Sequence, residues 1–381
     1  MSVRDLIIKR IQAKGPMPFA EYMDLCLYHP QHGYYSRVKK RTGQSGDFFT
    51  SVDIGSLFGE LLCKQFTEMQ QLLNQGKKRK TPYFTIVEAG AGSGRLCKDV
   101  LDHAKQYSPD FYHNCNYVLI EKSQTARSAQ KNNLMAHESH WENSQTKFPV
   151  GVNGVIFANE LLDAFPVHLI EMNEDGLREI YVNIKNSQFV EQLGPISSRA
   201  QKHVEDFDIA LEVGWRAEVC PEAISWVNNA AKCLNQGFLI LIDYGFESHD
   251  LYSDRHRSGT LRCYQRHTVQ SKNNNGPWLR DPGESDITAH VDLTAIRQTA
   301  ERAGLSTIAI TDQTYFLLSL ASNSDELTNP PMEDTTALRR RLALKTLLLP
   351  GSLGSTHKVL IFGKGIKEPQ LQSCTFANRI T

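Results

Sequence analysis

The sequence predicts an α/β fold: a Rossmann-like parallel sheet with a helical N-terminal cap and inserted segments. From Tyr83 onward, short apolar runs alternate with helical stretches, which is typical of parallel sheets with crossover helices. The first of these runs passes into a glycine turn that opens a helix, as in ligand-binding α/β sheets. Residues 1 to 75 differ, because they read as helices broken by a loop rich in Gly, Tyr and Pro.

The composition narrows the range of partners. The 381-residue chain has 42 basic and 42 acidic residues, so its formal net charge is zero. No overall field attracts a polyanion or an acidic membrane, and we expect neither nucleic acid nor membrane insertion. The eight cysteines contain no C-x-x-C pair, which predicts neither a zinc site nor disulfides and fits a reducing cytoplasm. No apolar run approaches the roughly 20 residues that span a bilayer.

The first 14 residues carry basic side chains around an apolar stripe, a pattern that superficially resembles an organelle presequence. We prefer an ordinary amphipathic helix, since too little chain precedes the motif-bearing segment at Phe19. A bacterial cytoplasmic location is therefore expected.

The apolar runs also predict how the chain is organised. We expect a helical cap or lid at residues 1–80, and core segments at residues 81–166, 205–245 and 300–365. A β-meander insertion with a turn at Asp175-Gly176 is expected at residues 167–204. Residues 246–299 read as a long polar excursion, and such excursions commonly build a substrate site above a sheet edge. Core strands are predicted at 84–87, 117–120, 154–158, 210–213, 238–242, 305–310 and 357–362, with a helix at 336–349.

The strongest signal is the glycine turn after the first strand, with Glu88 followed by Gly90, Gly92 and Gly94. Glycine allows positive φ and lets a ligand approach the main chain. A dinucleotide site normally reads G-x-G-x-x-G, but here the third glycine comes one residue early and Arg95 takes the place of the expected Gly or Ala. The acidic residue before the turn suits a cationic amino-acid ligand better than a pyrophosphate. We therefore favour S-adenosylmethionine, with a nicotinamide cofactor as the alternative.

The next strand ends at Glu121, where a carboxylate can accept hydrogen bonds from both ribose hydroxyls. The alternative is a solvated acid at a strand end. Glu121 lies farther from the glycines than the spacing of about 20 residues that is typical of such units. We therefore expect the intervening helix to be extended or to carry an extra loop.

Polar residues follow the fourth strand, with Asn159, Glu160 and Asp163 in the run A-N-E-L-L-D-A-F-P. If Glu160 to Asp163 form a helical turn, the two carboxylates share one face. Paired carboxylates can hold a guanidinium bidentately and concentrate electron density on its attacking nitrogen. Alternatively, Glu160 interacts with a helix dipole and Asp163 is a solvated or capping acid.

Two further candidates stand outside the sheet. Asp47 either approaches cofactor or substrate from the lid or caps a helix that begins near Asp53. His290 either moves a proton or is simply ordered by its neighbours.

Taken together, these motifs resemble the MidA-type family of class I S-adenosylmethionine-dependent methyltransferases. The resemblance covers nearly the whole chain. Its motifs are Glu21–Met23, Tyr28–Pro30, Gly33–Tyr35, Gly46–Phe48, Leu57–Glu60, Gly90–Gly94, Ala158–Pro166, Ile242–Gly245, Gly259–Tyr264 and Asp286–Asp292.

The resemblance implies a class I methyltransferase fold, S-adenosylmethionine at the glycine turn and protein arginine N-methyltransferase activity. Mitochondrial matrix members of the family assist respiratory complex I assembly and methylate an arginine of one of its subunits. The cofactor contacts carried over are Glu88, Gly90, Gly92, Gly94 and Glu121, with Asn159, Glu160 and Asp163 lining the acceptor site; Asn159 is expected to touch the cofactor as well.

The chain departs from the family pattern in the lid. After Gly46–Phe48 the family usually has a Thr-rich turn that ends in Pro-Glu, whereas this chain has Val52-Asp53, which shortens the lid carboxylate. The implied partner is a protein that presents an arginine, and a homodimer is left open. The alternatives are an S-adenosylmethionine-binding assembly factor or scaffold, a small-molecule methyltransferase with a general base such as His290, and a nicotinamide oxidoreductase.

Overall fold

The structure, a computed structural model, describes residues 2–36, 50–75, 83–265, 268–269, 276–322, 335–348 and 356–376. The chain divides into two compact units. The core unit comprises Phe49–Leu161, Asn228–Tyr244 and Arg297–Thr381, and the meander unit comprises Met1–Phe48, Leu162–Val227 and Gly245–Ile296. Each unit is described by itself below.

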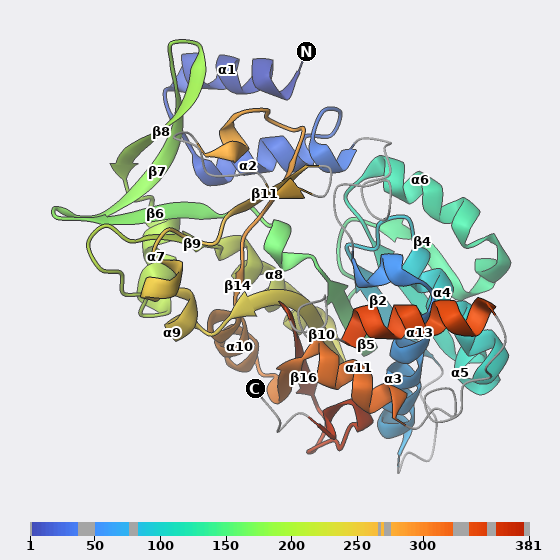
Figure 1. Ribbon diagram of the computed structural model, residues 1–381. Coiled ribbons are helices and arrows are strands. Elements are labelled where there is room, and N and C mark those ends of the chain that lie inside the picture. Colours follow the sequence, from blue (N-terminus) through green and yellow to red (C-terminus); the bar gives the residue numbers. More distant parts are fainter. Residues whose placement is uncertain are drawn as a thin grey trace. The chain divides into compact units, whose positions relative to one another are not determined.

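The core unit is built on a mostly parallel sheet, of which Figure 1 labels β2, β4, β5, β10 and β16. Its strand order is β15-β16-β10-β5-β2-β3-β4. The strands are β2 (Phe84–Ala89), β3 (Cys115–Ile120), β4 (Trp141–Gln145), β5 (Val152–Asn159), β10 (Leu234–Phe246), β15 (Ser306–Asp312) and β16 (His357–Lys364). Only β16 runs antiparallel to its neighbours β10 and β15. From β2 the order proceeds to β3 and β4 on one side and to β5 and β10 on the other. Such a switch point is where open α/β sheets bind ligands, at the carboxyl ends of the strands.

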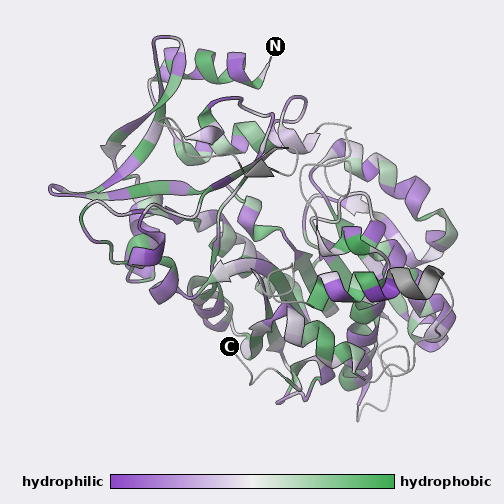
Figure 2. Cartoon of the chain, viewed as in Figure 1, coloured by the Kyte–Doolittle hydropathy of each residue, from purple (hydrophilic) through white to green (hydrophobic). Residues whose placement is uncertain are grey.

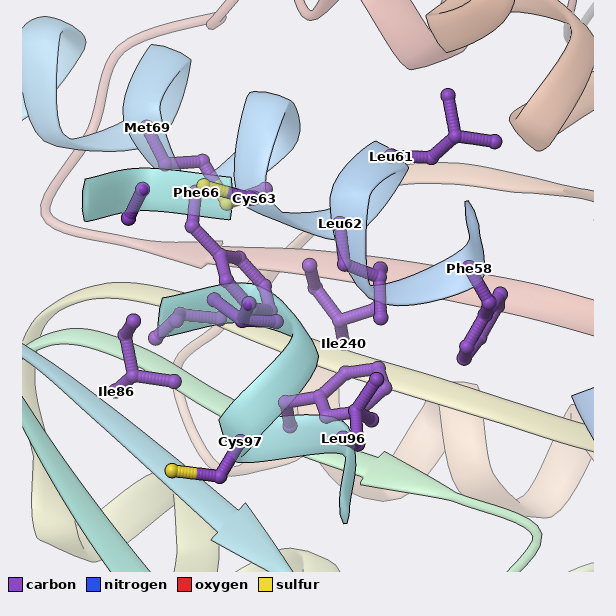
Figure 3. Close-up of a cluster of buried hydrophobic side chains, with 14 of the residues drawn as sticks. Phe58, Leu61, Leu62, Cys63, Phe66, Met69, Ile86, Leu96, Cys97 and Ile240 are labelled. Carbon is purple, nitrogen blue, oxygen red and sulfur yellow. The ribbon is translucent and has the colours of Figure 1, made fainter. Parts of the chain in front are cut away.

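Helices cover this sheet. They are α3 (Leu57–Asn74), α4 (Arg95–Tyr107), α5 (Pro109–His113), α6 (Gln124–Asn133), α11 (Gln313–Ala321) and α13 (Thr335–Leu348), while α8 (Pro221–Cys233) and α10 (Leu293–Arg302) cross from one unit to the other. Phe58, Leu62 and Phe66 on α3 belong to one buried cluster with Ile86 of β2 and Ile240 of β10 (Figure 3). The spacing of these α3 residues places them on one helix face, so the sheet and α3 share one apolar core.

The meander unit contains two small antiparallel sheets. One has the order β1-β7-β6-β9 with β8 on the outer side of β7, and the other has the order β12-β11-β13. The strands are β1 (Met17–Pro18), β6 (His168–Asn173), β7 (Gly176–Lys185), β8 (Gln188–Pro195), β9 (Arg216–Val219), β11 (Arg262–Gln265), β12 (Thr268–Val269), β13 (Asp286–Thr288) and β14 (Val291–Asp292), which pairs with the end of β10. The predicted hairpin turn is confirmed, since β6 and β7 pair antiparallel with Asn173 opposite Gly176, whose φ is 105°.

Short helices complete the meander unit: α1 (Val3–Lys14), α2 (Phe19–Tyr28), α7 (Ser198–Asp206) and α9 (Ser248–Leu251). In α1, hydrophobic and hydrophilic residues alternate along the ribbon (Figure 2). Val3, Ile7 and Ile11 are buried, and Ser2 forms a capping box with Asp5. The first segment is therefore an amphipathic helix of a folded unit, stabilised by its cap and its apolar face.

The predicted strand at 210–213 is wrong. These residues form no strand; β9 follows at Arg216–Val219 and pairs with β6 of the meander unit, not with the core sheet. The apolar run at 210–213 is not a buried strand, because Val213 is 63% exposed. The buried residues of the nearby strand β9 are Ala217 and Val219. The compact units also divide the chain differently from the expected boundaries, since α3 lies in the core unit and residues 205–227 lie in the meander unit. Its apolar face explains why α3 belongs with the sheet.

Within the described residues, no helix is both long and apolar enough to cross a membrane. The same residues contain no group of three or more His, Cys, Asp and Glu side chains that could hold a metal ion. All eight cysteines are free thiols.

Candidate functional site

The glycine turn after β2 adopts the backbone that the motif predicts. Gly90, Gly92 and Gly94 have φ values of 73°, 51° and 77°, in the left-handed region that favours glycine. A Cβ at Gly90 would lie 3.0 Å from Leu161, and one at Gly94 would lie 3.1 Å from Leu134, whereas a Cβ at Gly92 would meet no described atom within 4 Å. Gly90 and Gly94 are thus needed for packing as well, and Gly92 is the point where a ligand can approach the backbone.

Contacts from β3 and α6 hold the turn in place. The Gly90 and Ala91 N–H groups donate to the Ile120 carbonyl at 2.9 and 3.2 Å. The Gln130 side-chain amide donates to the Gly92 carbonyl at 2.7 Å, and that of Asn133 donates to the Ser93 carbonyl at 2.8 Å. The turn is therefore preorganised by neighbouring elements, which lowers the entropic cost of binding a ligand.

Glu121 follows β3 directly and also supports the turn. Its Oε2 accepts the Gly92 N–H at 2.8 Å and its Oε1 accepts the Ser123 N–H at 2.7 Å. Each carboxylate oxygen has a second lone pair, so the group can still accept a ribose hydroxyl. The long spacing before Glu121 is explained by α5, the extra helix inserted between α4 and β3.

Glu88 lies at the end of β2 and is only 5% exposed. Tyr117 on β3 donates its hydroxyl to Glu88 Oε2 at 2.8 Å. Burial raises the pKa of Glu88 to about 8, although the Tyr117 hydrogen bond opposes this rise. A nearby cation would stabilise the charged carboxylate and a pyrophosphate would oppose it. The buried acid therefore fits the cationic methionine end of S-adenosylmethionine, and its contact with that ligand stays a prediction.

Glu160 begins the turn after β5. Its N–H donates to the Ile242 carbonyl of β10 at 2.8 Å, and its φ is +49°, a strained value for a residue with a side chain. The short 3₁₀ helix that follows spans Leu162–Ala164 and starts beyond Glu160. The condition for placing Glu160 and Asp163 on one helical face is therefore not met, because the hydrogen bond to β10 holds Glu160 outside the helix.

The Glu160 carboxylate contacts its neighbour Asn159 and two residues that are distant in the sequence. Its Oε1 accepts the Asn159 side-chain amide at 3.1 Å and the Ser51 N–H at 3.3 Å. Its Oε2 lies 3.7 Å from Nε2 of the buried His357. Within the described residues, the buried Asn159 Oδ1 accepts no hydrogen bond. The arrangement holds a carboxylate in one place and leaves an acceptor beside it for a ligand donor.

The sequence did not identify His357 or Ser51 as site residues. His357 begins β16, and because this strand is antiparallel to β10, its first residue pairs with Tyr244 at the carboxyl end of β10. The ring of Tyr244 meets the His357 ring edge-on, with centroids 5.2 Å apart. A histidine at the start of an otherwise apolar final strand was the available signal. Nothing in the sequence near Ser51 indicates that its N–H reaches β5.

Asp243 supports the same edge from β10. It is buried, and its Oδ2 accepts the Leu161 N–H at 3.1 Å. This bond fixes the chain just after Glu160.

The other expected site residues have different surroundings. Asp163 lies in the meander unit, is 5% exposed, and its carbonyl accepts the Ala289 N–H at 3.0 Å. Asp47 lies outside the described residues. Asp53 closes a capping box with Thr50 and lies 3.4 Å from the Arg95 guanidinium.

His290 lies in the meander unit between aromatic rings, 5.2 Å from Phe246 and 6.3 Å from His256 by ring centroids. Burial, assisted by Arg262 and His256, lowers its pKa to about 4. A base with so low a pKa is weak near neutral pH, which favours the reading that its neighbours simply order it.

Comparisons with known proteins identify the family of this chain. A family model described as S-adenosyl-L-methionine-dependent methyltransferase matches residues 61–311. The human protein arginine methyltransferase NDUFAF7, a mitochondrial protein, is 28% identical over 320-odd residues, covering 77% of this chain and 68% of its own. The homologue from Caenorhabditis elegans is 28% identical and covers 76% of this chain and 70% of its own.

Solved structures extend the similarity to nearly the whole chain. A Burkholderia thailandensis protein bound to S-adenosyl-homocysteine superposes with a TM-score of 0.86 at 26% identity, covering 98% of this chain and 95% of that one. The ligand of that protein is the product of S-adenosylmethionine and not a nicotinamide dinucleotide. The chain thus belongs to the family of S-adenosyl-L-methionine-dependent methyltransferases, with the class I fold and S-adenosylmethionine as its cofactor.

Proposed function

We propose that this methyltransferase acts on an arginine of a partner protein and that Glu160 holds the acceptor guanidinium. The observation that carries the proposal is the strained, donor-bound Glu160 at the carboxyl end of β5, next to the glycine turn. Ala158 on β5 pairs with Ala89 on β2, immediately before Gly90. A non-glycine residue at positive φ costs on the order of 1–3 kcal/mol, and such strain persists at functional sites. The relatives named protein arginine methyltransferase support the choice of acceptor.

The chemistry asks little of the protein beyond placement. S-adenosylmethionine, when bound, supplies an electrophilic methyl group on a sulfonium. An acceptor nitrogen forms the new N–C bond as the C–S bond breaks, and the electron pair of that bond stays on sulfur. The displaced proton passes from the nitrogen to the Glu160 carboxylate and then to water. In-line displacement gains most from orientation, which the bonds from Ser51 and Asn159 to Glu160 supply.

The remaining residues have binding roles in this proposal. Gly92 leaves room for the methionine end, and Glu121 accepts the ribose hydroxyls. Asn159 Oδ1 accepts an N–H group of cofactor or substrate. The role of Asp163 in the acceptor site stays a prediction. We also propose a cytoplasmic location, which the free, mostly buried cysteines favour, and a protein partner; a homodimer stays a prediction.

Isotope transfer tests the activity. The full chain is incubated with methyl-labelled S-adenosylmethionine and an extract of cells that lack this protein, and the labelled proteins are hydrolysed to amino acids. We expect labelled methylarginine, with Glu160→Gln reducing the rate about 100-fold. Glu138→Gln is the matched control, because Glu138 is an exposed acid of the same unit.

The outcomes separate the competing functions. Label in another amino acid or in a small molecule would contradict arginine methylation. Binding of S-adenosylmethionine without any label transfer would favour the scaffold. A Glu160→Gln rate equal to that of Glu138→Gln would remove Glu160 from the acceptor site.

A further inference from the structure

The meander unit contains a cluster of acids and tyrosines that the cofactor site does not use. Tyr35 donates its hydroxyl to Asp286 Oδ1 at 2.7 Å, although the two residues are 251 positions apart. Tyr28 donates to the Ala164 carbonyl at 2.9 Å, and its ring centroid is 5.3 Å from that of Tyr35. The residue next to Ala164 is Asp163. Segments from α2, the 3₁₀ helix at Leu162–Ala164, and β13 thus meet in one place.

The register of β11 and β13 defines one face of this cluster. Tyr264 pairs with Asp286, and Arg262 pairs with Thr288. Side chains two residues apart share a face of a strand, so Tyr264, Arg262, Asp286 and Thr288 lie on one side of the ribbon. The alternate residue Ile287 belongs to the apolar core of the unit. The face that carries Arg262, Tyr264, Asp286 and Thr288 is therefore the polar one.

The carboxylates of Asp163 and Asp286 both affect the pKa of Tyr35 and Tyr264. Burial, followed by Asp286 and with a contribution from Asp163, raises the pKa of Tyr35 well above its ordinary value. Burial also raises the pKa of Tyr264, which both carboxylates favour and Arg262 opposes. Asp163 and Asp286 therefore both favour the protonated form of Tyr35 and Tyr264. The phenols stay protonated at neutral pH and can donate to the carboxylates.

A separate observation points to a ligand. Thr288 is 3% exposed, and its Oγ1 has no hydrogen-bond partner among the described residues. It lies on the polar face two residues from Asp286, which is 2% exposed. A buried hydroxyl without a partner is costly unless something fills its hydrogen-bonding capacity. The Thr288 hydroxyl and the Asp286 carboxylate share a face of the strand. One ligand with several N–H donors can therefore donate to both.

We propose that Asp163, Asp286 and Thr288, with the rings of Tyr28, Tyr35 and Tyr264, form a binding subsite for a planar guanidinium. Carboxylates accept its N–H groups bidentately, and tyrosine faces stack on its plane. The three tyrosines are half-buried, whereas both acids are buried. Arg262 offsets only part of the charge of the two carboxylates. The inference rests on arginine as the acceptor class of the proposed function, and it concerns residues of the meander unit alone.

The test uses small arginine analogues as probes, so that it does not depend on turnover. Binding of N-acetyl-arginine methylamide to the full chain is measured by NMR titration with S-adenosyl-homocysteine present. The citrulline analogue, which is isosteric and uncharged, is the probe control. We expect millimolar binding of the arginine probe and at least tenfold weaker binding of the citrulline probe.

Variants assign the binding to the cluster. Asp286→Asn is expected to weaken the arginine probe at least tenfold, and Tyr35→Phe about threefold, because it keeps the ring and removes the hydroxyl that orients Asp286. Asp175→Asn is the matched control, since Asp175 is an exposed acid at the β6–β7 turn. S-adenosyl-homocysteine affinity should stay within twofold in all three, which reports that the variants fold.

Equal binding of the two probes, or unchanged affinity in folded Asp286→Asn, would overturn the subsite. Probe binding that is selective for arginine and sensitive to Asp286, in a chain that transfers no label to arginine, would support the subsite while contradicting the proposed activity. Label transfer to arginine that is unchanged in Asp286→Asn would support the proposed activity and contradict the subsite.

Discussion

The cofactor turn and the acceptor edge differ in how the chain assembles them. The hydrogen bonds that hold the cofactor turn and its two acids all come from one continuous stretch between Glu88 and Asn133. The Glu160 carboxylate is instead held by Ser51, 109 positions earlier, and faced by His357 on the last strand. A local motif can be recognised from spacing alone, whereas the acceptor edge depends on strand order and register. We therefore expect variants of the two regions to fail in different ways.

The largest effect is expected at Gly92. Gly92→Val should weaken S-adenosylmethionine binding at least 100-fold, because the side chain would occupy the open approach to the turn. Calorimetric titration measures the affinity. The control is Gly151→Val, since Gly151 also has positive φ, at 76°, and an open Cβ position. If Gly151→Val loses the same affinity, backbone strain and not occlusion is responsible.

We expect the titration of Glu88, in the cofactor region, to make the stability of the protein depend on pH. Folding raises the carboxyl pKa of Glu88 from 4.5 to about 8, because the folded protein disfavours the charged form. The protonated Glu88 therefore contributes its full stabilisation below pH 4.5, and this stabilisation is lost as the pH rises through 8. Glu88→Gln should remove the loss and stabilise the protein above pH 8, on the order of a few kcal/mol. Denaturant unfolding at pH 6 and pH 9 measures it. A wild type and variant with parallel pH profiles would show that Glu88 is not the titrating group.

Glu121 should matter for the cofactor and hardly at all for the acceptor. Glu121→Ala removes the acceptor of the Gly92 and Ser123 N–H groups, and hydrogen bonds to a charged group contribute roughly 1.5–3 kcal/mol each. We expect S-adenosylmethionine affinity to fall about 10-fold or more, with the acceptor KM unchanged at saturating cofactor. Steady-state kinetics with both substrates varied checks this. A rise in the acceptor KM alone would contradict the separation of cofactor binding from acceptor binding.

The smallest expected effect concerns His357, which acts through Glu160. His357→Ala should lower kcat about threefold to fivefold by loosening the carboxylate, while S-adenosylmethionine affinity stays the same. His357→Gln, whose side-chain amide offers an N–H donor in place of the ring, should recover part of the rate. Single-turnover transfer from labelled cofactor provides the measurement. An unchanged rate in His357→Ala would mean that Ser51 and Asn159 suffice to position Glu160.

The sequence by itself determined the glycine turn, the acid at the end of β3, the polar run after β5 and the amphipathic first helix. Each is a local pattern in which side-chain periodicity or glycine spacing reflects the backbone directly. Local patterns were not enough at 210–213, where an apolar run lies outside any strand and the neighbouring segment pairs in another sheet.

Only the tertiary structure decided which distant residues meet. The antiparallel direction of β16 brings His357 to the carboxyl end of β10, and the ladder between β5 and β10 keeps Glu160 out of the helical turn expected for it. The pairing of β11 with β13 likewise puts Asp286 beside Tyr264, a neighbourhood that no spacing along the chain encodes. The physical reason is that strand pairing is fixed by long-range packing and register, which depend on the whole buried core and not on any one segment.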